Sequence, residues 1–107
     1  MIQVNIFKKS DYITKVIIHG HAEFGEYGKY LVCAGVSAVA TGICNTIAKK
    51  GYLDKKMCSI ELENGNIVIE VKEEDETLQV ILETLEISLQ SFLEDYHQFI
   101  KITYREE

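Results

Sequence analysis

Residues 57–71, MCSIELENGNIVIEV, decide the fold because they contain a recognisable hairpin. Two short runs with apolar residues, 57–62 and 67–71, flank the sequence Glu63-Asn64-Gly65-Asn66. An Asn-Gly pair in this place is the strongest short hairpin signal, since both residues tolerate the positive φ angles of a type I′ turn. The stretch therefore predicts two antiparallel strands in the second half of the chain.

A long amphipathic helix is predicted after this hairpin. Asp75 suits the N-cap position, and the helix covers residues 76–96. Its apolar residues recur at helical spacing and form one stripe: Leu78, Ile81, Leu82, Leu85, Leu89, Phe92, Leu93 and Tyr96. A second, partly apolar face fits either a dimer contact or deeper packing within one protomer: Val80, Thr84, Ile87 and Ser91. Residues 99–104 predict a last strand.

The first half of the chain predicts two further strands and another helix. Ile2, Val4 and Ile6 alternate with polar residues, which predicts a strand of about seven residues, and residues 12–20 predict a second strand after a turn. A helix over residues 33–50 follows, with Gly51 as its C-terminal cap. The order is ββαββαβ. We therefore expect a single domain over residues 1–107, an α+β two-layer sandwich with a mostly antiparallel sheet and two helices.

Composition excludes several classes of function. The net charge is -6 and the eleven basic residues are dispersed, which argues against binding to nucleic acid. No segment approaches the ~18 apolar residues of a membrane span, and the N-terminus lacks the pattern of a signal peptide. Three cysteines do not make a disulfide framework, and reduced thiols suit a cytoplasmic protein. The acidic surface would attract a basic partner.

His21 and Cys33 are the candidate catalytic pair. The histidine closes the predicted strand 12–20 and the cysteine opens the predicted helix 33–50. A thiol at a helix N-terminus lies at the positive end of the helix dipole, which favours the thiolate. The connection over residues 22–32 is about twice the usual ~2–6 residues, so the histidine can fold back onto the sulfur. This arrangement is the minimum for nucleophilic catalysis by cysteine.

Other residues near this pair have two interpretations each. Gly35 and Gly42 inside the helix indicate a close approach, either by the sheet or by a ligand. Ser37 lies one turn after Cys33, where its hydroxyl either bonds back to the Cys33 carbonyl or shapes the pocket floor. Cys44 and Cys58 fit buried, structural positions. Both are therefore left out of the site.

A metal site and a cofactor are not expected. His19 and His21, two residues apart in a strand, could bind zinc together with a cysteine. A structural zinc site needs a fourth ligand, and neither a Cys-x-x-Cys motif nor a second histidine pair supplies it.

The residues Gly20-His21-Ala22, Gly28 and Val32-Cys33-Ala34-Gly35-Val36-Ser37 resemble the signature of the bacterial ribosomal-processing cysteine proteases, the Prp family. The resemblance implies His21 as the base and Cys33 as the nucleophile, with Gly20 and Ser37 in supporting positions. It also implies that residues 22–32 form a mobile loop over the substrate, with contacts from Ala22, Phe24, Gly25, Tyr27, Gly28 and Tyr30. One position departs from the family pattern: Tyr30 stands where the family has an aspartate.

The resemblance further implies a substrate, the precursor of large ribosomal subunit protein twenty-seven, whose short N-terminal extension carries paired aromatic residues near the cut. Backbone N–H groups of residues 33–35 are expected to stabilise the oxyanion. A homodimer is possible. The alternatives are a non-catalytic ribosome-assembly binding module, in which Cys33 is merely buried, and a redox-sensing thiol.

Overall fold

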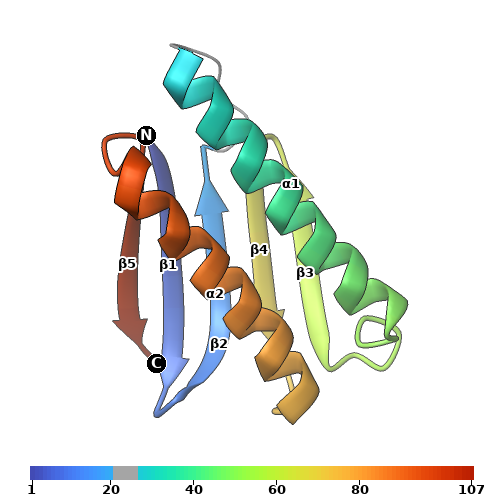
Figure 1. Ribbon diagram of the computed structural model, residues 1–107. Coiled ribbons are helices and arrows are strands. Elements are labelled where there is room, and N and C mark those ends of the chain that lie inside the picture. The colour runs from blue at the N-terminus through green and yellow to red at the C-terminus, as the bar shows by residue number, and fades with distance from the viewer. Residues whose placement is uncertain (21–26) are drawn as a thin grey trace.

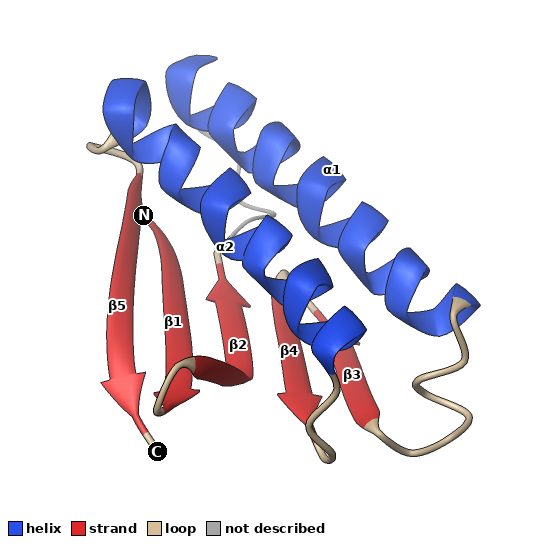
Figure 2. Ribbon diagram, turned by 60° about the horizontal axis from the view of Figure 1, so that its bottom comes forward, coloured by secondary structure: helices blue, strands red, loops and turns tan. Residues whose placement is uncertain are grey.

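The computed structural model describes residues 1–20 and 27–107, and these form one sheet covered by two helices (Figure 1). The elements in chain order are β1 (Ile2–Lys9), β2 (Tyr12–His19), α1 (Tyr27–Lys49), β3 (Cys58–Glu63), β4 (Asn66–Val71), α2 (Glu76–Tyr96) and β5 (Ile100–Glu106). The predicted ββαββαβ order and the α+β class are confirmed. Both helices lie on the same side of the sheet, and the described residues leave its other face uncovered (Figure 2).

The strand order in the sheet is β3-β4-β2-β1-β5. Three of the four pairings are antiparallel, and β1 with β5 is parallel. The predicted hairpin is the β3–β4 pair, and both Asn64 and Gly65 have positive φ angles, 43° and 82°. The turn therefore has the backbone signs that favour an Asn-Gly pair.

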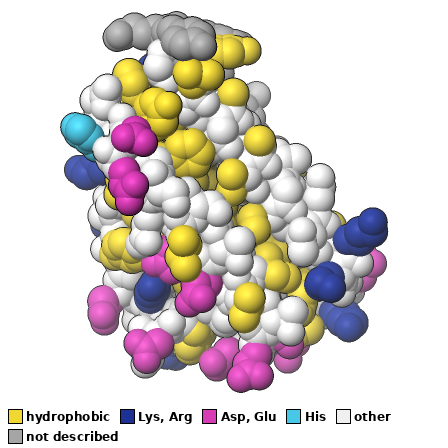
Figure 3. Space-filling model, in the orientation of Figure 1, with side chains coloured by type: hydrophobic (Ala, Val, Ile, Leu, Met, Phe, Trp, Pro, Cys, Tyr) yellow, Lys and Arg dark blue, Asp and Glu magenta, His cyan; other side chains and the backbone are white. Residues whose placement is uncertain are grey.

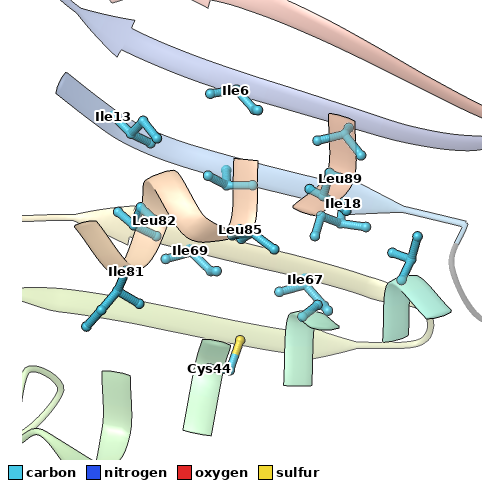
Figure 4. Close-up of a cluster of buried hydrophobic side chains, with 14 of the residues drawn as sticks. Ile6, Ile13, Ile18, Cys44, Ile67, Ile69, Ile81, Leu82, Leu85 and Leu89 are labelled. Atoms are coloured by element: carbon cyan, nitrogen blue, oxygen red, sulfur yellow. The ribbon is translucent and has the colours of Figure 1, made fainter. Parts of the chain in front are cut away.

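The core lies between the sheet and the helices. Alternate strand residues such as Ile6, Ile18 and Ile69 point toward α2, whose residues Leu82 and Leu85 face them (Figure 4). The predicted α2 stripe is confirmed: Leu78, Ile81, Leu82, Leu85 and Leu89 are buried, and Phe92, Leu93 and Tyr96 pack partly buried against them. This packing fixes α2 across the middle of the sheet.

The second face of α2 is not packed within the described part of the chain. Val80 and Ile87 are both more than half exposed. The hydroxyl of Thr84 donates a hydrogen bond to the Val80 carbonyl, and that of Ser91 donates to the Ile87 carbonyl. Deeper packing within one protomer is therefore wrong for these two apolar residues. Figure 3 shows further hydrophobic side chains distributed over this helix-covered side of the molecule.

Helix α1 begins at Tyr27, six residues before the predicted start at Cys33. Gly28 looks like a loop residue in the sequence, but in the structure it lies in the first turn of the helix with the Phe99 ring against it. A Cβ at Gly28 would come within 2.9 Å of Phe99 Cε2. The missing side chain therefore lets an aromatic ring pack on the helix, which offsets the ~1 kcal/mol that glycine costs there.

The longer α1 changes one expectation about membranes. Among the described residues, the stretch Gly28–Lys49 is long and apolar enough to span a membrane by length and composition. The expectation that no segment approaches this length is wrong, because the helix starts earlier than predicted. Its buried residues Val32, Val36, Ala40 and Ile47 belong to the same apolar cluster as the strands, so one side of α1 packs in the core.

The start of α2 is held by its N-cap. Asp75 accepts a hydrogen bond from the Leu78 backbone N–H at 3.0 Å and a second from the Tyr52 hydroxyl at 2.6 Å. The hydrogen bond from Tyr52, followed by that from Leu78, lowers the pKa of the Asp75 carboxyl. The ionised carboxylate thus joins the turn after α1 to the first turn of α2.

This cap predicts an acid-dependent loss of stability. Because the folded pKa of Asp75 lies below its unfolded value, the carboxylate stabilises the fold above the unfolded pKa, about 3.9. That contribution disappears as the pH falls through the folded pKa. Tyr52→Phe removes the largest cause of the shift. We therefore expect its urea midpoint to lie below that of the wild type at about pH 7 and to approach it at about pH 2.5. An equal difference at both pH values would contradict the assignment.

Candidate active site

The end of β2 meets α1 at the candidate nucleophile. The Cys33 thiol lies 3.9 Å from the carbonyl oxygen of Gly20 and donates to it. Gly20 also donates its N–H to the carbonyl of Gly65 at 3.2 Å, in the β3–β4 turn. Gly20 is therefore held between the hairpin and α1, and it is the residue to which His21 is covalently joined.

Gly20 also ends the alternation of strand β2. Ile18 is buried on the helix side, and His19 is exposed on the opposite face, where its Nδ1 bonds to Asn66 Oδ1. Strict alternation would assign His21 to the face of His19, away from Cys33. However, the strand ends at His19, and Gly20 has φ +88°, a conformation that favours glycine. The regular alternation of β2 therefore ends before Gly20, and His21 lies outside the described residues.

Cys33 lies nearly two turns inside α1 and not at its start. The dipole argument for activation at a helix N-terminus is therefore wrong for this cysteine. Backbone N–H groups from Cys33 to Gly35 are engaged in the helix, so they are not free to bind an oxyanion; only the first turn of a helix has such groups. The cysteine is 4% exposed and lies beside the fully buried Val32 and Val36.

The structure places only part of the predicted substrate loop. Four of the predicted site residues lie outside the described residues: His21, Ala22, Phe24 and Gly25. Tyr27 is the first residue of α1, and only its backbone is described.

The expectation that the loop extends to residue 32 is wrong, because Gly28 and Tyr30 belong to α1. Tyr30 is half exposed on the helix, and Ser37 lies partly buried one turn beyond Cys33. Tyr30 thus lies three residues before Cys33 in the same helix.

Two aromatic residues that sequence reasoning left out of the site hold this part of α1. The ring of Phe92 packs against Gly35, and that of Phe99 packs against Gly28, one from α2 and one from the turn before β5. The close approach predicted at Gly35 is therefore made by the neighbouring helix, and neither the sheet nor a ligand is needed to explain it. The sequence did contain a signal for this packing: Gly28 and Gly35 are seven residues apart, which places both on one face of a helix.

Gly35 and Gly42, both in the interior of α1, give a matched pair of predictions. A Cβ at Gly42 meets nothing within 4 Å, so Gly42→Ala is expected to raise the free energy of unfolding by about 1 kcal/mol. A Cβ at Gly35 lies 2.9 Å from two atoms of Phe92. Over-packing of this kind costs about 1–3 kcal/mol, so Gly35→Ala is expected to be net destabilising. Urea unfolding of both variants checks the signs, and stabilisation by both would contradict the packing account.

The other two cysteines do not have the properties of a nucleophile. Cys44 and Cys58 are buried and free, in α1 and β3. Burial raises the pKa of the Cys44 thiol, and burial followed by repulsion from Cys44 raises the pKa of Cys58 to about 11. Both stay protonated near neutral pH, which agrees with the structural role that we expected for them.

A metal centre is not found in the described part of the chain. No group of three or more His, Cys, Asp or Glu side chains there is arranged to hold an ion. His19, one of the two histidines considered for zinc, is hydrogen-bonded to Asn66.

These features define a site built around the thiol of Cys33, which α1 carries, on an α+β sandwich. A family model described as cysteine protease Prp matches residues 1–101. The ribosomal processing cysteine protease Prp of Staphylococcus aureus is 37% identical over 95 residues, 87% of this chain and 88% of that protein.

Two crystal structures of the S. aureus protease are similar along their whole length. One, in complex with a substrate peptide, has a TM-score of 0.81 and 32% identity, covering 98% of this chain and 100% of the other. The second, with a covalently linked product peptide, has a TM-score of 0.79 and 34% identity over the same shares. The chain belongs to the Prp family and is a cysteine protease of ribosomal processing.

Proposed function

We propose that this protease removes the N-terminal extension of large ribosomal subunit protein twenty-seven through a dyad of Cys33 and His21. The observation that carries the proposal is the 3.9 Å approach of the Cys33 sulfur to the Gly20 carbonyl. His21 directly follows Gly20 in the sequence, so the proposed base is the neighbour of the residue that contacts the thiol. The S. aureus relative with a covalently linked product peptide supports covalent chemistry in this family.

The reaction follows from the chemistry of the two side chains. His21 takes the proton of the Cys33 thiol, and the sulfur attacks the carbonyl carbon of the scissile peptide bond. The bond to nitrogen breaks, the amine leaves with the proton from His21, and a thioester remains on Cys33. Water adds to the thioester carbonyl and releases the carboxylic acid, while the proton returns to sulfur. Because Cys33 is 4% exposed, the thiol must be uncovered before the first step.

Substrate selection is assigned to aromatic side chains and charge. Phe24, Tyr27 and Tyr30 contact the paired aromatic residues near the cut, and Ser37 supports the pocket under the sulfur. The net charge of -6 attracts a ribosomal protein, which needs basic residues to bind RNA. The enzyme works in the cytoplasm, where its substrate is made.

A homodimer through the exposed Val80 and Ile87 of α2 remains a prediction. Sedimentation of the wild type and of Ile87→Glu checks it, since a charge in an apolar contact would dissociate the pair.

The test uses the full-length precursor of large ribosomal subunit protein twenty-seven. Purified protease is incubated with it, and mass spectrometry locates any new N-terminus. A single cut that removes the extension is the expected result. Binding without any cut would favour the non-catalytic assembly module. Reversible oxidation of Cys33 by peroxide, without cleavage of the precursor, would favour the redox sensor.

A further inference from the structure

Strand β3 has an unpaired edge. It is the first strand in the order β3-β4-β2-β1-β5, and within the described residues only β4 pairs with it. The backbone groups on its other side are therefore open to another extended chain, which can add to the sheet as a further strand. The exposed part of β3 is its last three residues, Glu61, Leu62 and Glu63.

The two edges of the sheet carry opposite charge. On the face of the sheet away from the helices, β3 presents Ser59, Glu61 and Glu63, and the strand contains no basic residue. The other edge strand, β5, presents Lys101 and Arg105 there. A basic extended segment is thus favoured at β3 and disfavoured at β5.

The helix side of the same edge carries an exposed apolar residue. Leu62 lies directly across from the buried Ile67, yet it is 67% exposed because the described part of the chain does not cover it. An added strand would place its own side chains beside Leu62 and remove apolar surface from water.

The exposed half of this edge lies next to the active site. Glu63 is paired with Asn66 at the start of the β3–β4 turn, and Gly65 in that turn accepts the hydrogen bond from Gly20. Gly20 in turn accepts from the Cys33 thiol. Two interstrand spacings of ~4.8 Å separate β3 from β2, a distance that three or four extended residues span. A chain that leaves the β3 edge at this end therefore reaches the sulfur easily.

We infer that the free edge of β3 binds an extended, basic segment of the protein substrate next to the cleavage site, by strand addition. This inference rests on the proposed function, because it assigns the substrate a second contact outside the dyad. Main-chain hydrogen bonds hold the segment, Glu61 and Glu63 select its positive charge, and Leu62 covers one of its apolar side chains. The contact lowers KM and leaves the chemical step unchanged.

The experiment compares two double variants with the same change in net charge. Glu61→Gln with Glu63→Gln removes both carboxylates of the β3 edge. Glu83→Gln with Glu94→Gln removes two exposed carboxylates from α2 and serves as the control. Both are assayed on a long peptide that contains the cleavage site and a lysine-rich flank, and on the same peptide with the lysines replaced by serine. We expect the β3 variant to raise KM about five-fold for the basic peptide only, with kcat unchanged.

A second measurement follows the backbone directly. Hydrogen exchange of residues 58–63 is recorded in Cys33→Ala protein with and without the basic peptide. Slower exchange in β3, abolished when the peptide backbone is N-methylated, is expected for strand addition. Equal effects of the two double variants, or unchanged exchange in β3, would overturn the inference. If the wild type cuts neither peptide but the peptide still slows hydrogen exchange in β3, the proposed cleavage is wrong and the binding of a strand at the β3 edge is supported.

Discussion

Replacing Cys33 by alanine is expected to lower kcat/KM for the ribosomal precursor by at least about a thousand-fold. In the proposed mechanism the sulfur forms the covalent intermediate, and no other cysteine can replace it, because burial keeps Cys44 and Cys58 protonated. Alanine suits the helix, and the substitution removes the sulfur that contacts the Gly20 carbonyl. The initial rate of precursor cleavage by mass spectrometry is the measurement, with circular dichroism to show that the variant is folded.

Cys44→Ala is the matched control for this substitution. It removes a thiol from the same helix, in the apolar cluster of the core, and is expected to keep kcat/KM within about two-fold at a temperature where it is folded. Alkylation by iodoacetamide gives a second readout, since the modified peptide should contain Cys33 alone. Cleavage that survives in Cys33→Ala would remove the covalent mechanism.

Replacing His21 by alanine is expected to have the second-largest effect, a loss of about 100- to 10,000-fold in kcat/KM. In the proposed mechanism the imidazole moves the proton twice, once from the thiol and once to the leaving amine. His19→Ala is the control, because this histidine lies two residues earlier on the exposed face and bonds to Asn66. It should stay within about three-fold of the wild type.

The pH profile separates a proton-transfer role of His21 from a structural one. The wild type should show an ionisation between about pH 5 and 8 in its profile of kcat/KM, and His19→Ala should keep it. In His21→Ala this ionisation should be absent from the pH profile of kcat/KM. An equal loss of activity in both histidine variants, with unchanged profiles, would show that the dyad assignment is wrong.

Elements with strong local signals could be predicted from the sequence alone. Helix α2 has the predicted bounds because Asp75 caps it and its apolar stripe continues over five turns. The Asn64-Gly65 turn is equally local. Strand order was not predictable, since the parallel pairing of β1 with β5 joins residues from the two ends of the chain.

The start of α1 shows why the rest was missed. Glycines at 25 and 28 indicate a loop by local rules, but the ring of Phe99 packs on Gly28 and the helix includes it. That compensation comes from a residue distant in sequence, which no window around Gly28 contains. The motif named Gly20 and Cys33 as site residues, and the structure brings these two together. The rings of Phe92 and Phe99 could not be found in this way, because they carry no chemical signature.

The hydrogen bond from Gly20 to Gly65 has a practical consequence. Hairpin tips are usually the safest places to insert an affinity tag or a reporter, because they are exposed and make few contacts with the rest of the protein. Here the tip is hydrogen-bonded to Gly20, the residue that precedes the proposed general base His21. A graft between Asn64 and Gly65 would disturb the hydrogen bond to Gly20 and, through it, the contact with Cys33, so fusions to this enzyme are better placed away from this hairpin.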